Sequence, residues 1–129
     1  MKFLLDTHTI LWYLFGDSRL SNNAKMLIDT NVCFYSYVSF WEISIKQSKG
    51  KLEFSHTIFD IDEMCMKAGF RKLPVTLADL NKVRNLTFQE NVKHNDPFDR
   101  LLISQAVEND MTIITCDEKI PLYDVKTVW

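Results

Sequence analysis

The chain has 129 residues, of which 47% are hydrophobic and 25% are charged, and its formal net charge is −2. This composition is typical of one globular domain and excludes a disordered or low-complexity protein. The near balance of acidic and basic residues also argues against a protein that coats nucleic acid through bulk positive charge alone.

Short apolar runs alternate with helical patterns along the chain. In chain order we expect a strand at 2–5, helices at 7–15 and 18–29, a strand at 32–36, helices at 39–50 and 56–69, a strand at 71–75, a helix at 77–84, a polar stretch at 85–95, a helix at 97–109, a strand at 111–116 and a short strand near Val125. Pro74 favours an edge position for the strand at 71–75. Strands separated by helices predict an α/β fold with a mostly parallel sheet flanked by helices.

The sequence indicates neither export nor a membrane span. No apolar run approaches ~18 residues, and Asp6 and His8 interrupt the apolar residues that open the chain, so we expect no signal peptide. The three cysteines, Cys33, Cys65 and Cys116, lack the spacing of a zinc site or of a disulfide framework. We expect Cys33 and Cys116 in the core and the protein in the cytoplasm.

Asp99 occupies a position that a solvated carboxylate would avoid. The predicted core-facing stripe of its helix contains Leu102, Ile103, Ala106 and Val107, and Asp99 falls near the centre of that stripe. A lone carboxylate there costs several kcal/mol unless another group compensates it. A capping contact in the first helical turn is one explanation, and a pocket at the start of the helix is the better one.

Two other acids have competing structural explanations. Asp96 directly precedes Pro97 and is expected to cap the helix, with a contact to metal-bound water as a second possibility. Glu42 lies beside the apolar stripe of its own helix. A capping box with Ser39 and a place in a pocket are equally open for Glu42.

Asp6 and Asp117 follow apolar strands directly, and the carboxyl ends of parallel strands open into one crevice. With Asp99 and Glu42 they would place four carboxylates in a small volume. Two unit charges about 4 Å apart repel by roughly 4 kcal/mol at an effective dielectric constant near 20. We therefore expect a divalent cation, and all-oxygen ligands favour Mg²⁺, with Mn²⁺ as a substitute.

Several side chains are expected around these acids. Thr7 and Thr115 are placed to hydrogen-bond to the carboxylates or to bound water. Lys46 and Arg100 are candidate contacts to a polyanionic substrate, with solvated surface charge as the alternative. His94 lies near Asp96, but the histidines show no metal-ligand spacing.

A carboxylate-held Mg²⁺ activates water and offsets the charge of a phosphodiester, so the pattern predicts phosphodiester hydrolysis without a nucleophilic side chain. The residues alone leave open an RNA nuclease, a DNA nuclease, and a catalytically silent module that binds RNA or protein. A phosphatase with an aspartyl nucleophile is disfavoured, because the second acid that it needs, two residues after Asp6, is His8 here.

Four motifs, LLDTHTILW at 4–12, SFWEISIK at 39–46, HNDPFDRLLISQA at 94–106 and TIITCD at 112–117, together resemble PIN-domain proteins, specifically the VapC-type toxins. The resemblance spans nearly the whole chain, and the order and spacing of the motifs make it specific. It implies a single PIN-like domain over residues 1–129, with a three-layer fold and a sheet of four to five strands.

The resemblance also implies roles for the acids. Asp6, Glu42, Asp99 and Asp117 match the acidic quartet of the family, and Asp96 matches an accessory acid. Asp117 stands at the last acidic position, which varies in the family, so a direct and a water-mediated role are both open there. The implied activity is a Mg²⁺- or Mn²⁺-dependent endoribonuclease, the toxin of a type II toxin–antitoxin system, usually a homodimer inhibited by its cognate antitoxin.

Overall fold

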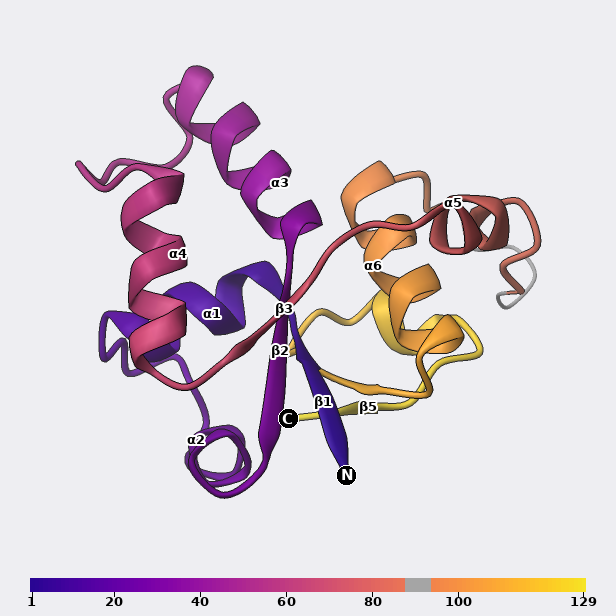
Figure 1. Ribbon diagram of the computed structural model, residues 1–129, viewed down its shortest axis with the longest axis horizontal. Coiled ribbons are helices and arrows are strands. Elements are labelled where there is room, and N and C mark those ends of the chain that lie inside the picture. Colours follow the sequence, from indigo (N-terminus) through magenta and orange to yellow (C-terminus); the bar gives the residue numbers. More distant parts are fainter. Residues whose placement is uncertain (88–93) are drawn as a thin grey trace.

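A computed structural model describes residues 1–87 and 94–129, so most of the predicted polar stretch, residues 88–93, lies outside the described residues. The strands are β1 (Lys2–Leu5), β2 (Val32–Ser36), β3 (Arg71–Leu73), β4 (Thr112–Ile114) and β5 (Thr127–Val128). They form one sheet in the order β3-β2-β1-β4-β5, and every neighbouring pair is parallel (Figure 1). The parallel sheet and the edge position of β3 are both confirmed.

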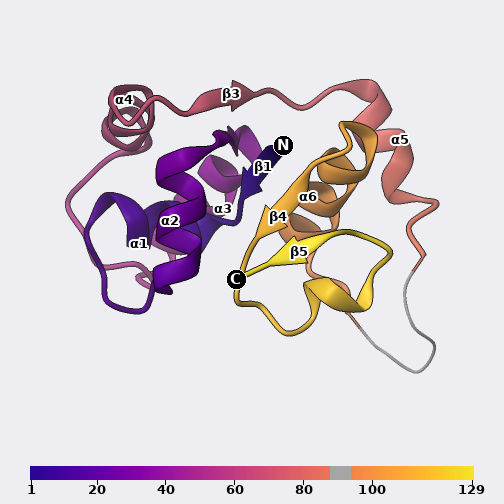
Figure 2. The same ribbon diagram turned by 90° about the horizontal axis from the view of Figure 1, so that it is seen from below.

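Helices cover both faces of this sheet. They are α1 (Thr7–Leu14), α2 (Asn22–Thr30), α3 (Tyr37–Ser48), α4 (Ile58–Lys67), α5 (Leu77–Val83), α6 (Pro97–Glu108) and the short 3₁₀ helix η1 (Ile120–Leu122). Figure 2 shows α1, α2 and α4 on one side of the sheet and α5 and α6 on the other, which is the predicted three-layer arrangement. Within the described residues, no helix is long and apolar enough to cross a membrane.

The covering of both sheet faces explains why the central strand β1 is apolar from Phe3 to Leu5. Phe3 and Leu5 pack into the core on the side of α1, α2 and α4, whereas Leu4 packs against α6 on the opposite side. Successive side chains of a strand point to opposite faces of the sheet. Because both faces of a parallel sheet are covered by helices, a buried strand carries no polar alternation.

The predicted start of α3 is wrong by two residues. The helix begins at Tyr37, because the Ser36 hydroxyl accepts a hydrogen bond of 3.0 Å from the Val38 N–H and caps it. Ser39 and Glu42 both lie inside the helix, so the proposed capping box between them does not form. The sequence predicted a start at Ser39, and the direct passage from β2 into α3 places the cap at Ser36 instead.

The expectation for Cys116 is also wrong. Cys33 is buried as predicted, whereas Cys116 is exposed. The last strand residue of β4 is Ile114, so Cys116 lies in the loop that follows the strand. The apolar run in the sequence therefore continues beyond the end of the strand.

Packing of α6 against the sheet positions the acids described below, and Leu102 is a main contact. Leu102 is 2% exposed in the core cluster that also contains Leu4 and Ile113. Leu102→Ala is expected to lower the free energy of unfolding by about 2–5 kcal/mol, because it leaves a cavity in a packed interior. Urea unfolding monitored by circular dichroism measures this change.

Leu77→Ala is the matched control, because Leu77 is 84% exposed at the start of α5. It should change the free energy of unfolding by less than about 0.5 kcal/mol. Equal losses in the two variants would contradict the placement of α6 against the sheet.

Candidate functional site

The predicted acids come together where the parallel strands end. Asp6 directly follows β1, Glu42 lies on α3 just after β2, and Asp117 lies in the loop after β4. Asp99 lies in the first turn of α6, the helix that leads into β4 and therefore begins at this edge of the sheet. The negative charges of Asp6, Asp96, Asp117 and Glu42 all act on Asp99, so the five acids are electrostatic neighbours.

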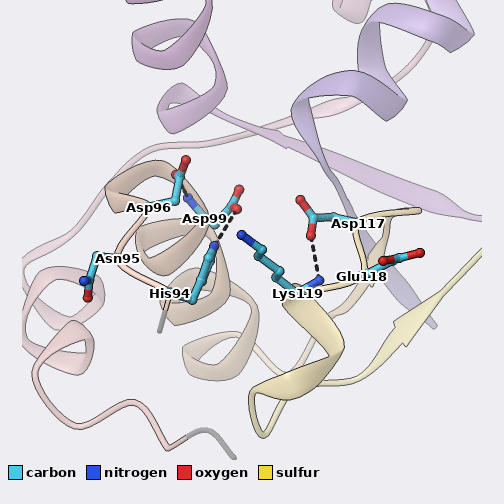
Figure 3. A pocket seen from close by; sticks show the side chains of 7 residues that line it. All are labelled: His94, Asn95, Asp96, Asp99, Asp117, Glu118 and Lys119. Carbon is cyan, nitrogen blue, oxygen red and sulfur yellow. Dashed lines mark hydrogen bonds and ion pairs between the residues drawn. The ribbon is translucent and has the colours of Figure 1, made fainter. Parts of the chain in front are cut away.

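An open pocket of about 680 Å³ lies at this edge (Figure 3). Its lining comprises His94, Asn95, Asp96, Asp99, Asp117, Glu118 and Lys119. Asp6 and Glu42 are not part of this lining, and both are buried, near enough to Asp99 for their charges to act on it. The site therefore has an accessible layer of acids from α6 and the loop after β4, and a buried layer from β1 and α3.

Asp6 is held by the segments on either side of it. Its carboxylate accepts a 2.8 Å hydrogen bond from the Thr7 N–H, which caps α1, and a 2.7 Å hydrogen bond from the Thr115 hydroxyl. Its own N–H donates to the carbonyl oxygen of Ile114 over 3.2 Å, which joins the ends of β1 and β4. Burial raises the pKa of the Asp6 carboxyl, and the two hydrogen bonds oppose this effect.

Both carboxylate oxygens of Glu42 also have partners within the protein. The Thr7 hydroxyl donates a 2.7 Å hydrogen bond to Oε1 and lies 2.9 Å from the Ser39 hydroxyl. The Lys46 ammonium forms an ion pair with Oε2 from one turn further along α3. Thr7 therefore binds both buried acids, Asp6 through its amide and Glu42 through its hydroxyl.

Asp99 is half-buried, and its Oδ2 lies 3.1 Å from Nε2 of His94. Burial, followed by the negative charges of Asp6, Asp96 and the other acids, raises the pKa of Asp99 to about 8. Ionisation of Asp99 is therefore unfavourable at neutral pH unless positive charge is supplied. Cations bound nearby would reverse that preference.

The other two acids are oriented by backbone hydrogen bonds. Asp96 accepts a 2.9 Å hydrogen bond from the Asp99 N–H and caps α6, which confirms its predicted capping role. Asp117 accepts a 2.7 Å hydrogen bond from the Lys119 N–H, and its own N–H donates to the Thr115 hydroxyl over 3.0 Å. The side chains of both acids still face the pocket (Figure 3).

The two predicted substrate contacts have partners within the protein. Lys46 is paired with Glu42, and Arg100 donates to the Tyr123 hydroxyl over 3.1 Å and to the carbonyl oxygen of Val83 over 3.3 Å. Neither cation is among the residues that line the pocket.

Four pocket residues were not predicted as site residues, namely His94, Asn95, Glu118 and Lys119. His94 contacts Asp99 directly, and its only sequence signal was its position in the same motif as Asp96. Lys119 extends from the loop after β4 into the space between Asp99 and Asp117 (Figure 3). A lysine two residues after a strand-end acid carries no local signal that separates it from solvated surface lysines.

The donor set fits a hard divalent cation. Asp6, Glu42, Asp99 and Asp117 supply only oxygen atoms, and the pKa of Asp99 is raised by burial and then by negative charge that a cation would offset. As the described side chains stand, no three of their His, Cys, Asp or Glu groups are close enough together to ligate one ion directly. An ion among these acids would therefore contact some of them only through its bound waters, as Mg²⁺ commonly does in proteins.

Comparisons with known proteins agree with this description. The family model for the PIN domain matches residues 3–126. A search of the curated proteins finds no match.

Three solved structures illustrate the likeness in fold. VapBC2 from Rickettsia felis, bound to a DNA fragment from its promoter, aligns with a TM-score of 0.71 at 14% identity over 99% of this chain and 98% of that chain. FitAcB from Neisseria gonorrhoeae aligns with a TM-score of 0.63 at 16% identity over 98% and 96%. A toxin-antitoxin complex from Klebsiella pneumoniae aligns with a TM-score of 0.62 at 18% identity over 98% and 95%.

The raised pKa of Asp99 leads to a prediction about stability in metal-free buffer. The folded state holds the Asp99 proton with a pKa of about 8, against an ordinary value of 3.8, so wild-type stability is lost as the pH rises through this window. Asp99→Asn cannot ionise and should gain stability relative to wild type over the same window, with no further gain at higher pH. At about 1.4 kcal/mol per pKa unit, the gain should exceed about 1.4 kcal/mol near pH 9.

Urea unfolding of both proteins in EDTA, at about pH 5 and about pH 9, measures this gain. Glu53→Gln serves as the control, because Glu53 is exposed and lies outside the pocket. A constant difference between Asp99→Asn and wild type across this pH range would contradict the electrostatic description of the site.

Proposed function

Because the chain belongs to the PIN domain family, we propose that it is a metal-dependent endoribonuclease and the toxin of a type II toxin–antitoxin pair. The observation that carries the proposal is the gathering of acids from four segments at one edge of the sheet, where burial together with their mutual repulsion raises the pKa of Asp99 to about 8. Like charges held together in this way destabilise a fold unless a bound cation offsets them.

In this proposal Asp6, Glu42, Asp99 and Asp117 hold Mg²⁺, for which Mn²⁺ can substitute. When bound, such an ion activates water as a nucleophile and offsets the charge that develops on a phosphodiester. All-carboxylate sites of this kind commonly bind the phosphates of their substrates.

The residues of the chain prepare the acids for this task. Thr115 and the Thr7 N–H orient the Asp6 carboxylate, while the Thr7 hydroxyl and Lys46 hold Glu42. Ordered ligands of this kind lose little further freedom when an ion binds. Asp96, as the cap of α6, sets the backbone from which Asp99 projects.

Lys119 is the candidate for attracting the substrate to a pocket that is otherwise acidic. It is exposed, and it lies between Asp99 and Asp117 at the open side of the pocket (Figure 3). A single cation placed there can contact a backbone phosphate beside the scissile bond. Lys119 would then make the contact with the polyanionic substrate that the sequence suggested for Lys46 and Arg100.

The proposed partner is an antitoxin. The structures from Rickettsia felis and Klebsiella pneumoniae are those of VapBC2 and of a toxin-antitoxin complex, and each aligns over nearly the whole of this chain. We propose that the present protein likewise forms a complex with an antitoxin. In this proposal it is one PIN-like domain over residues 1–129, and it forms a homodimer in the cytoplasm.

Cleavage assays test the enzymatic part of the proposal. Purified protein is incubated with structured RNAs and single-stranded DNA in Mg²⁺, Mn²⁺ or EDTA. Wild type is expected to cut RNA only when a divalent metal is present. Folded Asp6→Asn and Asp99→Asn should each lose at least about a hundredfold in rate, because each removes a metal ligand.

Asp29→Asn is the matched control, since Asp29 pairs with Lys25 on the surface outside the pocket. It should cut RNA at the wild-type rate. Cleavage of DNA but not RNA would overturn the proposed substrate. Equal rates for wild type and Asp99→Asn would overturn the proposed site, and a wild type that binds no metal and cuts neither polymer would identify a silent binding module.

Growth measurements test the toxin part. Induced expression of wild type in a bacterial host should arrest growth, because cleavage of a cellular RNA stops protein synthesis. Asp99→Asn, expressed to the same level, should leave growth unchanged. Growth arrest by both proteins would contradict a toxicity that depends on this site.

A further inference from the structure

His94 connects Asp99 to a chain of buried polar groups. His94 is 6% exposed and Tyr123 is 4% exposed, so both lie inside the protein. Nε2 of His94 is 3.1 Å from Asp99 Oδ2, and Nδ1 is 2.8 Å from the Tyr123 hydroxyl. The two ring nitrogens therefore face different partners on opposite sides of the imidazole.

Tyr123 is fixed in turn by α6. Its hydroxyl accepts a 3.1 Å hydrogen bond from Arg100, and the Arg100 guanidinium also binds the carbonyl oxygen of Val83. The rings of His94 and Tyr123 meet edge to face, with their centroids 5.5 Å apart. The imidazole is thus held by ring packing as well as by hydrogen bonds.

The pattern of donors indicates which nitrogen of His94 carries a proton. The Tyr123 hydroxyl oxygen lies 2.8 Å from Nδ1 and 3.2 Å from the carbonyl oxygen of His94, and the hydroxyl has one hydrogen to donate. An ionised Asp99, the form that would ligate a metal, can only accept, so a neutral imidazole beside it carries its proton on Nε2 and accepts from the hydroxyl at Nδ1. Nε2 in that tautomer donates to Asp99.

We propose that His94 is the positioning residue of Asp99: the Nε2–H holds Oδ2, which leaves Oδ1 to face the pocket. This inference rests on the proposed function, because it gives Asp99 the orientation that a metal ligand requires. Without the contact, the carboxylate is free to rotate away from the acids that repel it. Arg100 and Tyr123 act one step further away, by holding the imidazole.

Two substitutions of His94 separate this role from general packing. The amide nitrogen of Gln occupies a position close to that of Nε2, so His94→Gln keeps a donor for Asp99. Asn is shorter and places its amide near the Nδ1 position, so His94→Asn keeps a polar group beside Tyr123 but loses the donor to Asp99. Both variants replace the ring by an amide, and they differ mainly in which partner they can reach.

The first measurement is Mn²⁺ binding, followed by electron paramagnetic resonance of the free ion. We expect His94→Asn to bind Mn²⁺ about 10- to 100-fold more weakly than wild type, the usual effect of losing a partner that orients a ligand, and His94→Gln to remain within about threefold. Tyr123→Phe should weaken binding by a smaller factor. Tyr13→Phe, which removes a hydroxyl that binds Asp29, is the control and should bind as wild type does.

A kinetic measurement distinguishes positioning from a direct part in the reaction. His94→Asn should need a higher Mg²⁺ concentration than wild type to reach its half-maximal rate. Its kcat should be nearly restored at saturating Mg²⁺. A kcat that stays low at saturating metal would overturn the inference in favour of His94 as a catalytic residue. Equal Mn²⁺ affinities for His94→Asn and wild type would overturn it outright.

Crystal structures of metal-free His94→Asn and His94→Gln test the inference independently of nuclease activity. We expect the Asp99 carboxylate to turn or to occupy several conformers in His94→Asn, and to keep its orientation in His94→Gln. An unchanged carboxylate in both variants would show that His94 does not position it. Should wild type bind no metal, the proposed function fails, while these structures still decide the role of His94.

Discussion

Negative charge confined at one edge of the sheet is the constraint on which the rest of the site depends. Asp99 lies half-buried among the charges of Asp6, Asp96, Asp117 and Glu42, and burial together with this repulsion raises its pKa to about 8. Hydrogen-bond donors in the surrounding structure reduce the free-energy cost of burying these carboxylates. Hydrogen bonds to a charged group are stronger than those between neutral groups, so a few of them have a large effect.

Several of these donors also join parts of the fold that are distant in sequence. Thr115 brings the end of β4 to Asp6, and Thr7 connects the start of α1 to Glu42 on α3. His94 and Tyr123 connect the start of α6 to the segment after η1. The hydrogen bonds that orient the acids thus also fix how the strand ends and helix starts meet, which couples the geometry of the site to the stability of the fold.

Much of the site could be predicted because its acids stand at unusual places in local patterns. Asp99 interrupts the apolar stripe of α6, and Asp6 ends a buried strand. The prediction failed at the start of α3, which was placed at Ser39, because the path of the chain from β2 puts the cap at Ser36 and no pattern within the helix records that path. Cys116 was misplaced for a related reason, since an apolar run does not show where strand pairing ends.

The sequence by itself determined the alternation of strands and helices, the parallel sheet, the covering of both sheet faces and the acids that would meet at its edge. These features follow from the periodicity of burial and from caps, which are local properties. Only the tertiary structure decided that Lys119 enters the pocket, that Arg100 binds Tyr123, and that His94 holds Asp99. Such contacts join residues whose neighbourhood depends on strand order and helix packing, and no pattern within one segment encodes them.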